Sequence, residues 1–362
     1  MTEHPSLDGI HVPLITPLTA DGRIAADSLE ELAHAVLAAG ATGIVALGTT
    51  AEAATLDSDE RTAVVEVCAR VCRERGATLI IGAGGNDTRA SAAALAACRR
   101  WPVAAAALVQ VPSFTRPSAA GVLAHFTRLA ERSPLPLIVY HVPYRTAQPL
   151  DVTTLRALGR LPMVIGVKLA VGGIDQDTVE LLGDPPPGFA VLAGDDLFVS
   201  PLLALGAAGA ILASAHLATE RFVELAAAWR VGDVVRARAL GHGLARLSAA
   251  AFGEPNPTVI KGVLHARGLV PTPDVRLPLL PAGRAALDAT LSRLAEVAGG
   301  PAKPDERARP NEPAWLDERA WLDERAWLDE RALPNKPARP TGKADPAGLA
   351  HAANPAVPGD PS

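Results

Sequence analysis

The sequence has few aromatic residues, few cysteines and no long apolar run. Aromatic residues make up 4% of the 362 residues and hydrophobic residues 49%, so a large core is possible, built mainly from aliphatic side chains. No apolar run reaches the roughly 18 residues that span a bilayer. The first ten residues, MTEHPSLDGI, lack the basic and apolar regions of a signal peptide. We therefore expect a cytoplasmic protein that neither crosses a membrane nor is secreted.

Charge and cysteine usage exclude further classes. The 34 Lys and Arg residues against 39 Asp and Glu leave a net charge of −5, so nucleic acid is not an expected partner. The three cysteines form no C-x-x-C pair, and we expect them to be buried, reduced thiols. No group of residues has the spacing of metal ligands, and Asp195-Asp196 alone is too little for a magnesium site. We expect neither a metal nor a cofactor.

The composition changes sharply towards the C-terminus. Residues 299 to 362 hold 11 of the 32 prolines, and WLDERA occurs three times between residues 315 and 332. A six-residue step turns a helix by about 600°, so the three tryptophans of this repeat would share no helix face. We expect a folded domain over residues 1 to 298 and a disordered, proline-rich tail over residues 299 to 362. A short solvated helix and a docking peptide are alternatives for the repeat.

Short β-rich runs alternate with alanine- and leucine-rich amphipathic stretches through the first 298 residues. Strict alternation predicts a parallel sheet. Eight such units in about 220 residues match a closed (β/α)₈ TIM barrel better than an open doubly wound sheet. The expected strands are Ile10–Leu14, Gly43–Leu47, Thr78–Ala83, Ala106–Val111, Leu137–His141, Val164–Leu169, Ala190–Ala193 and Ala210–Ser214.

Additional helices are expected after the eighth unit. Among the helices of the barrel, Asp27 and Ser58 are expected N-caps, and Gly40 and Gly76 are expected to follow the same two helices. The additional C-terminal helices include Asp233–Phe252 and Pro257–Arg267.

Lys168 carries the strongest single signal of chemistry. It lies in LPMVIGVKLAVGG, residues 161 to 173, which contains no other charged residue. Burial disfavours the ammonium form, so such a lysine can lose its proton near neutral pH and act as a nucleophile. The alternative is a strand-end lysine whose stem is packed and whose ammonium group reaches water. Taken alone, residues 161 to 173 favour a lysine whose ammonium group reaches water. The residues expected around Lys168 favour a nucleophile instead.

The surroundings are the polar residues expected at the carboxyl ends of the strands, where TIM barrels hold their active sites. Both tyrosines of the chain, Tyr140 and Tyr144, occur within five residues, and a phenol beside the lysine could shuttle protons. Thr49 and Thr50 offer hydroxyl groups to a small carboxylate. Arg145 can bind a carboxylate with two parallel hydrogen bonds. Each residue alone is also typical of an ordinary strand end or a solvated surface, so the signal lies in their combination.

Five motifs together resemble the dihydrodipicolinate synthase / N-acetylneuraminate lyase family, over about residues 8 to 296. The resemblance implies a (β/α)₈ barrel with C-terminal helices, usually a homotetramer, with a homodimer as the alternative. It also implies a lysine Schiff base to pyruvate or a related 2-oxo acid. The motifs are GTTAE (48–52), YHVPYRT (140–146), GVKLA (166–170), AGDD (193–196) and EPNPTVIKGVL (254–264).

The resemblance assigns catalytic roles to three residues. Lys168 matches the lysine that forms the Schiff base. Tyr140 matches the tyrosine that relays protons. Thr49 matches the threonine of the same relay.

The resemblance also assigns binding roles. Thr50 matches the threonine that binds the pyruvate carboxylate. Gly194 and Ile211 match residues that line the pyruvate pocket. Arg145 matches the arginine that, in the synthase branch, binds the carboxylate of aspartate semialdehyde.

Several residues depart from the family pattern. Ala51 replaces a glycine in the usual GTTGE, which is expected to stiffen or shift the turn. Phe114 stands where the synthase branch has the tyrosine that a neighbouring subunit inserts to complete the relay, and a phenyl ring cannot pass a proton. His141 replaces the usual asparagine. Ser113, Ser58 and Arg61 depart from the lysine-inhibitor site, so feedback by lysine is not expected.

The sequence therefore predicts a class I pyruvate-dependent lyase or aldolase. The favoured activity is 4-hydroxy-tetrahydrodipicolinate synthesis from pyruvate and L-aspartate-4-semialdehyde. An aldolase or hydratase-aldolase that acts on another aldehyde or sugar acid is the alternative, favoured by Phe114. A non-catalytic barrel that senses a ligand or serves as a scaffold is a third hypothesis, and the gathering of polar residues at one rim argues against it.

Overall fold

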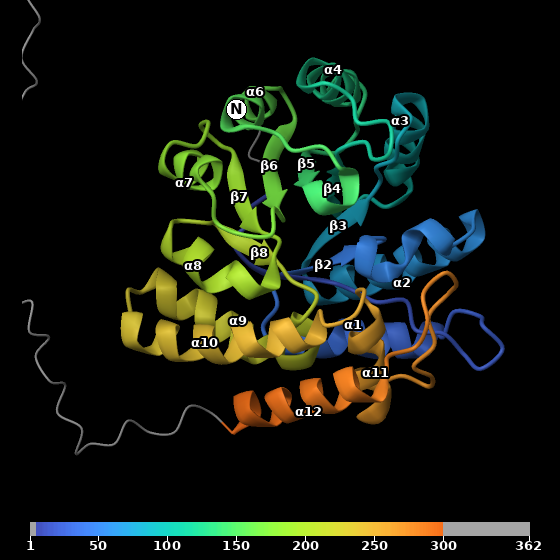
Figure 1. Cartoon of the computed structure of the whole chain (residues 1–362). Coiled ribbons are helices and arrows are strands. Elements are labelled where there is room, and N and C mark those ends of the chain that lie inside the picture. Colours follow the sequence, from blue (N-terminus) through green and yellow to red (C-terminus); the bar gives the residue numbers. More distant parts are fainter. Residues whose placement is uncertain (1–4, 300–362) are drawn as a thin grey trace, which may run out of the picture. The chain divides into compact units, whose positions relative to one another are not determined.

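The structure is a computed structural model, and it describes residues 5 to 299. Eight parallel strands form a closed barrel in which each strand pairs with its neighbours in sequence, and β1 pairs with β8 (Figure 1). This is the TIM barrel that the alternating pattern predicted. The strands are β1 Gly9–Pro13, β2 Gly43–Ala46, β3 Thr78–Gly82, β4 Ala104–Gln110, β5 Leu137–His141, β6 Val164–Leu169, β7 Ala190–Ala193 and β8 Gly209–Ile211.

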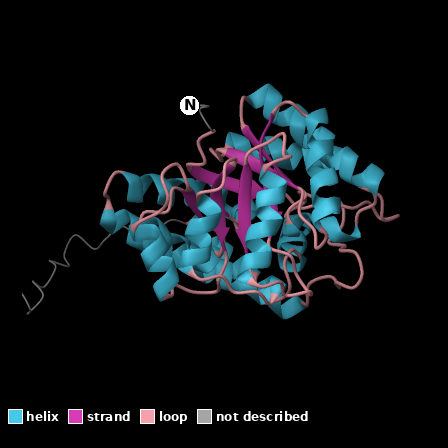
Figure 2. Ribbon diagram, turned by 90° about the horizontal axis from the view of Figure 1, so that it is seen from above, coloured by secondary structure: helices cyan, strands magenta, loops and turns pink. Residues whose placement is uncertain are grey.

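Helices surround the barrel on the outside, as Figure 2 shows from above. Their apolar faces pack against the outward side chains of the strands, which builds a largely aliphatic outer core. The helices are α1 Ala26–Ala38, α2 Ser58–Arg75, α3 Thr88–Ala97, α4 Ala119–Ala130, α5 Pro143–Thr146, α6 Val152–Gly159, α7 Gln176–Gly183, α8 Val199–Ala204, α9 Ala215–Arg230, α10 Val234–Ala251, α11 Thr258–Ala266 and α12 Arg284–Ala298.

A second, smaller apolar cluster fills the barrel itself. Successive side chains of a strand point to opposite faces, so alternate residues of each strand face inward. On β5, Ile138 and Tyr140 belong to the inner cluster, whereas Val139 belongs to the outer one. Tyr140 is paired in register with Lys168 of β6. The register therefore brings the phenol and the amine to the same level of the barrel, and it turns His141 outward.

Two of the expected N-caps are wrong, because each helix begins at or before the residue that was expected to cap it. The side chain of Asp57, rather than Ser58, accepts hydrogen bonds from the backbone N–H groups of Asp59 and Glu60, which forms a capping box. At α1, Asp27 lies inside the first turn and the N-cap is Ala25, which makes no side-chain cap. Gly76 ends α2 in the left-handed conformation (φ +63°), as expected.

The additional C-terminal helices are present. The expected stretches Asp233–Phe252 and Pro257–Arg267 correspond to α10 and α11, and α10 packs against α9 and α12 (Figure 1). The predicted tail and its WLDERA repeats lie outside the described residues. None of the helices within residues 5 to 299 is long and apolar enough to cross a membrane.

Candidate active site

A cavity of about 410 Å³ opens at the carboxyl ends of the strands. Loops after β2, β5, β6 and β7 contribute to its wall, and residues of α10 and the α10–α11 loop complete it. It lies where barrel enzymes place their chemistry. Six of the seven predicted site residues line it: Lys168, Tyr140, Thr49, Thr50, Arg145 and Gly194.

Lys168 lies near the end of β6, with its side chain enclosed by the barrel wall. Only 7% of the residue is exposed. Burial lowers the pKa of its amine from 10.5 to about 8, and the negative charges of Asp196 and Asp195 oppose this shift. At pH 7 roughly one amine in ten is then uncharged, compared with one in a few thousand for a solvated lysine. The site therefore supplies a nucleophilic amine near neutral pH.

Tyr140 lies directly beside this amine. Lys168 Nζ is 4.5 Å from the centroid of the Tyr140 ring, and Tyr140 is 8% exposed. Burial raises the pKa of the phenol, although the Thr49 side chain and the charge of Arg145 oppose the shift. The phenol is therefore protonated at neutral pH. It can donate a proton to a departing hydroxyl group and recover it from a neighbour.

The loop after β2 presents Thr49 and Thr50 to the cavity. Thr50 is buried, and its Oγ1 accepts a hydrogen bond of 2.9 Å from Asn256 Nδ2. Because Oγ1 is the acceptor, the hydroxyl hydrogen of Thr50 remains available to a ligand. Gly82 at the end of β3 permits this loop position, since a Cβ there would lie 2.1 Å from the Leu47 carbonyl oxygen.

Ala51 does not strain the turn, and whether it stiffens or shifts the turn relative to the family's glycine stays a prediction. It lies in a 3₁₀ turn, Thr49–Ala51, and the left-handed conformation falls on Glu52 (φ +54°). The Ala51 carbonyl accepts a hydrogen bond of 2.8 Å from Thr16 Oγ1. An alanine therefore fits this position without a positive φ.

Glu52 connects the loop to the C-terminal helices. Its Oε1 accepts a hydrogen bond of 2.8 Å from Nζ of Lys261 on α11, and both side chains are buried. Its Oε2 accepts a bond of 2.7 Å from the backbone N–H of Arg276. Glu52 is therefore a structural residue that fixes the loop bearing the two threonines.

Arg145 lies on the short helix α5 at the rim of the cavity. Its guanidinium group is 4.8 Å from the ring centroid of Tyr144, and both side chains are exposed. A ligand with a carboxylate could therefore reach it from solvent. Stacking on an aromatic ring restricts the motion of the guanidinium group and leaves its N–H donors available to a ligand.

Gly194 and Ile211 differ in their relation to the cavity. Gly194 lines it, and a Cβ there would lie 2.8 Å from Lys168 Cγ, so glycine leaves the space that the lysine stem occupies. Ile211 belongs to the inner cluster together with Tyr140 and is not part of the lining of the cavity. Contact of Ile211 with a ligand stays a prediction.

The sequence did not assign roles to several residues that complete the site. Asn256 orients Thr50 although 206 positions separate them in the chain. Asp195 and Asp196 accept 2.6 Å hydrogen bonds from the N–H groups of Gly172 and Ser214, so both carboxylates are held near Lys168. The run AGDD gave a sequence signal for the aspartates, whereas nothing near Asn256 indicated its partner. Within the described residues, no group of three or more His, Cys, Asp or Glu could hold a metal ion.

Three of the residues that depart from the family pattern either form hydrogen bonds with nearby residues or are exposed. Ser113 donates its hydroxyl to Asn86 Oδ1 at 2.8 Å, and Arg61 Nη2 donates to the Ala53 carbonyl at 2.7 Å. Phe114 is 91% exposed and has a φ of +65°, which is uncommon for a bulky residue.

A sequence profile of the dihydrodipicolinate synthetase family matches residues 6 to 296. The chain belongs to this family. The 4-hydroxy-tetrahydrodipicolinate synthase of Neisseria meningitidis serogroup B is 38% identical over 275 residues, which cover 76% of this chain and 93% of the relative. A 4-hydroxy-tetrahydrodipicolinate synthase 2 of Clostridium acetobutylicum is 34% identical over 275 residues, which cover 76% of this chain and 95% of the relative.

Solved structures of the family agree with this relationship. The chloride-inhibited dihydrodipicolinate synthase of Acinetobacter baumannii, complexed with pyruvate, superposes with a TM-score of 0.77 at 34% identity, covering 81% of this chain and 99% of the other. A monomeric dihydrodipicolinate synthase variant gives a TM-score of 0.77 at 29% identity, with 80% and 97% covered. The structures related to this chain therefore include a monomeric variant.

Proposed function

We propose that this protein is a 4-hydroxy-tetrahydrodipicolinate synthase that condenses pyruvate with L-aspartate-4-semialdehyde through a Schiff base on Lys168. The observation that carries the proposal is a buried lysine whose pKa falls to about 8, next to a protonated phenol. The curated relatives bear the name of this activity at 34–38% identity.

The first half of the reaction forms the enamine. The neutral Lys168 amine attacks the keto carbon of pyruvate, and the resulting carbinolamine loses water, with Tyr140 supplying the proton that leaves with the hydroxyl group. Thr49 then passes to the Tyr140 phenolate the proton that the pyruvate methyl group loses in the next step. The protonated imine is an electron sink, so the methyl group loses a proton and becomes a nucleophilic enamine. The Thr50 hydroxyl and loop N–H groups hold the pyruvate carboxylate.

The second half joins the two substrates. The enamine carbon adds to the aldehyde carbon of the semialdehyde, whose carboxylate Arg145 binds and orients. The amino group of the semialdehyde then attacks the imine carbon and closes a six-membered ring. Expulsion of the Lys168 amine from that carbon releases the product and restores the enzyme.

Reductive trapping tests the Schiff base. Borohydride added to the full-length protein with saturating pyruvate should attach one reduced pyruvate to Lys168, seen by mass spectrometry of the intact chain and located by peptide mapping. Lys168→Ala should stay unmodified. A wild-type protein that stays unmodified would overturn the lysine mechanism and favour a ligand-sensing barrel.

One observation favours a second candidate, an aldolase for another aldehyde. Phe114 offers no hydroxyl group to a proton relay. If the protein is the synthase, turnover of aspartate semialdehyde should exceed that of uncharged aldehydes. Arg145→Gln should then remove this difference, and Arg145→Lys should retain part of it. If Phe114→Tyr lowers turnover of the semialdehyde, the pocket is adapted to a different substrate.

The proposal includes an assembly of two or four copies in the cytoplasm and a dispensable tail. Phe114 supports contact with a second copy, because its ring is exposed and it stands where the synthase branch has the tyrosine that a neighbouring subunit inserts. Sedimentation velocity of the full chain should give a dimer or tetramer, and Phe114→Asp should weaken this assembly.

Deletion of residues 300 to 362 should leave the melting temperature and the turnover nearly unchanged.

A further inference from the structure

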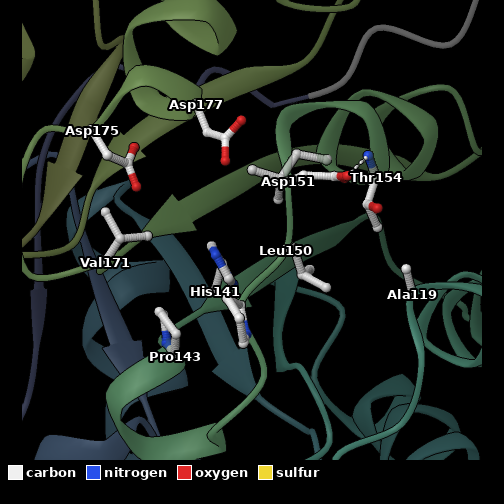
Figure 3. A pocket seen from close by; sticks show the side chains of 11 residues that line it. Ala119, His141, Pro143, Leu150, Asp151, Thr154, Val171, Asp175 and Asp177 are labelled. Atoms are coloured by element: carbon white, nitrogen blue, oxygen red, sulfur yellow. Dashed lines mark hydrogen bonds between the residues drawn. The ribbon is translucent and has the colours of Figure 1, made fainter.

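A second cavity lies on the outer side of the barrel wall, beside β5 and β6. Its volume is about 490 Å³, and it shares no lining residue with the candidate active site. Figure 3 shows it between the loops that lead into α6 and α7. Its size is within the range of small-molecule sites.

His141 forms the floor of this cavity. The residue is 2% exposed, its Nδ1 is buried without a hydrogen-bond partner, and its ring makes no hydrogen bond within residues 5 to 299. In Figure 3 the ring points into the cavity, towards Asp175. A buried polar ring without a partner is costly, so the orientation indicates a place for a hydrogen-bonding ligand. Burial lowers the pKa of His141 to about 4, against the charge of Asp175, so the ring is neutral and can accept a hydrogen bond.

Three carboxylates line the same cavity, and no Lys or Arg does. One oxygen of each is already used: Asp151 accepts from the N–H of Thr154, Asp175 from Thr178 and Asp177 from the N–H of Val152. The second oxygen of each makes no hydrogen bond or salt bridge in the part of the chain that the structure describes. The cavity thus has a negative rim with free acceptors.

Two of these carboxylates, Asp151 and Asp175, are charged at neutral pH. Hydrogen bonds from Thr154 lower the pKa of Asp151. Burial alone would raise the pKa of Asp175, and the hydrogen bonds from Thr178 outweigh it, so this pKa is also lowered. Apolar side chains, among them Leu150 and Val171, form the rest of the wall.

We propose that this cavity binds a small aliphatic amine in its ammonium form, with the ammonium group between Asp175, Asp177 and His141 and the alkyl chain against Leu150 and Val171. Charge selects the ligand class: an anion would meet three carboxylates and no cation. The neutral imidazole accepts one N–H of the ammonium group, and the free carboxylate oxygens accept the others.

Calorimetric titration of the full-length protein with 1,5-diaminopentane tests the proposal. At pH 7.5 and low salt we expect saturable binding with a Kd below about 1 mM that weakens as sodium chloride is added. The matched compound 6-aminohexanoate keeps one ammonium group and adds a carboxylate, so it should bind at least about tenfold more weakly. Absence of saturable binding, or equal binding of both compounds, would overturn the proposal.

Conservative variants locate the site. Asp177→Asn keeps an acceptor for the N–H of Val152 and removes the charge, and it should weaken the diamine about five- to tenfold. Asp233→Asn is the control, because Asp233 also caps a helix, accepting from the N–H of Arg236 at 3.0 Å, but lies outside the cavity. It should bind as wild type does.

His141→Phe keeps an aromatic ring and removes the acceptor, so it should weaken binding by a similar factor. Unchanged melting temperatures would show that the variants fold. If Asp177→Asn and His141→Phe both bind the diamine as wild type does, the amine binds elsewhere and the inference is wrong.

Discussion

Two buried lysines, Lys168 on β6 and Lys261 on α11, differ in whether a carboxylate contacts the amine. Lys261 Nζ lies 2.8 Å from Glu52 Oε1, within a pair that is almost fully buried. Lys168 has no ion-pair partner among the described residues, and its nearest aromatic contact is the Tyr140 ring. Burial lowers the pKa of both amines, and Glu52 opposes the shift at Lys261.

The comparison indicates that a buried lysine also needs the absence of a contacting carboxylate to lose its proton near neutral pH. A carboxylate in hydrogen-bond contact retains the proton on the amine, and the pair then serves as a structural link. Near Lys168 the carboxylates of Asp195 and Asp196 are held instead by backbone N–H groups. They contribute charge without a direct hydrogen bond, so the amine can lose its proton.

The largest expected effect comes from removing the paired lysine. Lys261→Met leaves Glu52 buried without its cation, which should lower the free energy of unfolding by about 3–5 kcal/mol. Urea unfolding at pH 7 measures the change. The double variant Glu52→Gln/Lys261→Met should recover part of the loss, because no uncompensated charge remains. A loss below about 1 kcal/mol would mean that the pair is not buried in solution.

Replacing Lys168, which has no ion-pair partner among the described residues, should raise the free energy of unfolding rather than lower it. Because the pKa of Lys168 falls from 10.5 to about 8, its charged form destabilises the folded state. Lys168→Met should therefore raise the free energy of unfolding at pH 7 by about 3 kcal/mol while abolishing turnover.

The same effect has a defined pH dependence. A depressed lysine pKa means that the unfolded state binds more protons, so wild-type stability rises with pH from about 8 to about 10.5. The advantage of Lys168→Met should be complete below pH 8 and should disappear as the pH rises through this range. Urea unfolding at several pH values follows it, and an advantage that does not change with pH would contradict the assigned cause.

A third, smaller effect concerns the rate of Schiff-base formation. Only the neutral amine attacks a ketone, so kcat/KM for pyruvate should rise about tenfold per pH unit below pH 8 and level off above it. Steady-state kinetics between pH 6 and 9.5 gives the profile. A midpoint near pH 10 would show that the amine is solvated.

The sequence predicted the barrel because each strand contains its own signal. Three strands, β5, β6 and β7, have the expected bounds. The start of α2 was misplaced by one position because Asp57 and Ser58 are both good N-caps, and only the contact with Glu60 distinguishes them.

The site was predictable to the extent that it follows the strand ends. Lys168, Tyr140 and the two threonines converge because parallel strands all end at one rim. The contacts of Asn256 and Lys261 were not predictable, because both residues reach the GTTAE loop from more than 200 positions away and the motif that contains them does not identify their partners. Ile211 belongs to the inner cluster of the barrel. Whether it reaches the cavity depends on how the side chains of several strands pack together, which cannot be predicted from the residues around Ile211.

The smallest expected effect concerns the two aspartates near Lys168. Asp196 raises the pKa of this lysine more than Asp195 does, so Asp196→Asn should move the midpoint of the kcat/KM profile below pH 8, by less than about one unit. Asparagine can still accept the N–H of Ser214 through Oδ1, so the loop keeps its position. Asp195→Asn is the matched comparison and should shift the midpoint less in the same direction. Equal shifts, or a shift to higher pH, would show that the carboxylates act on Lys168 through something other than their charge.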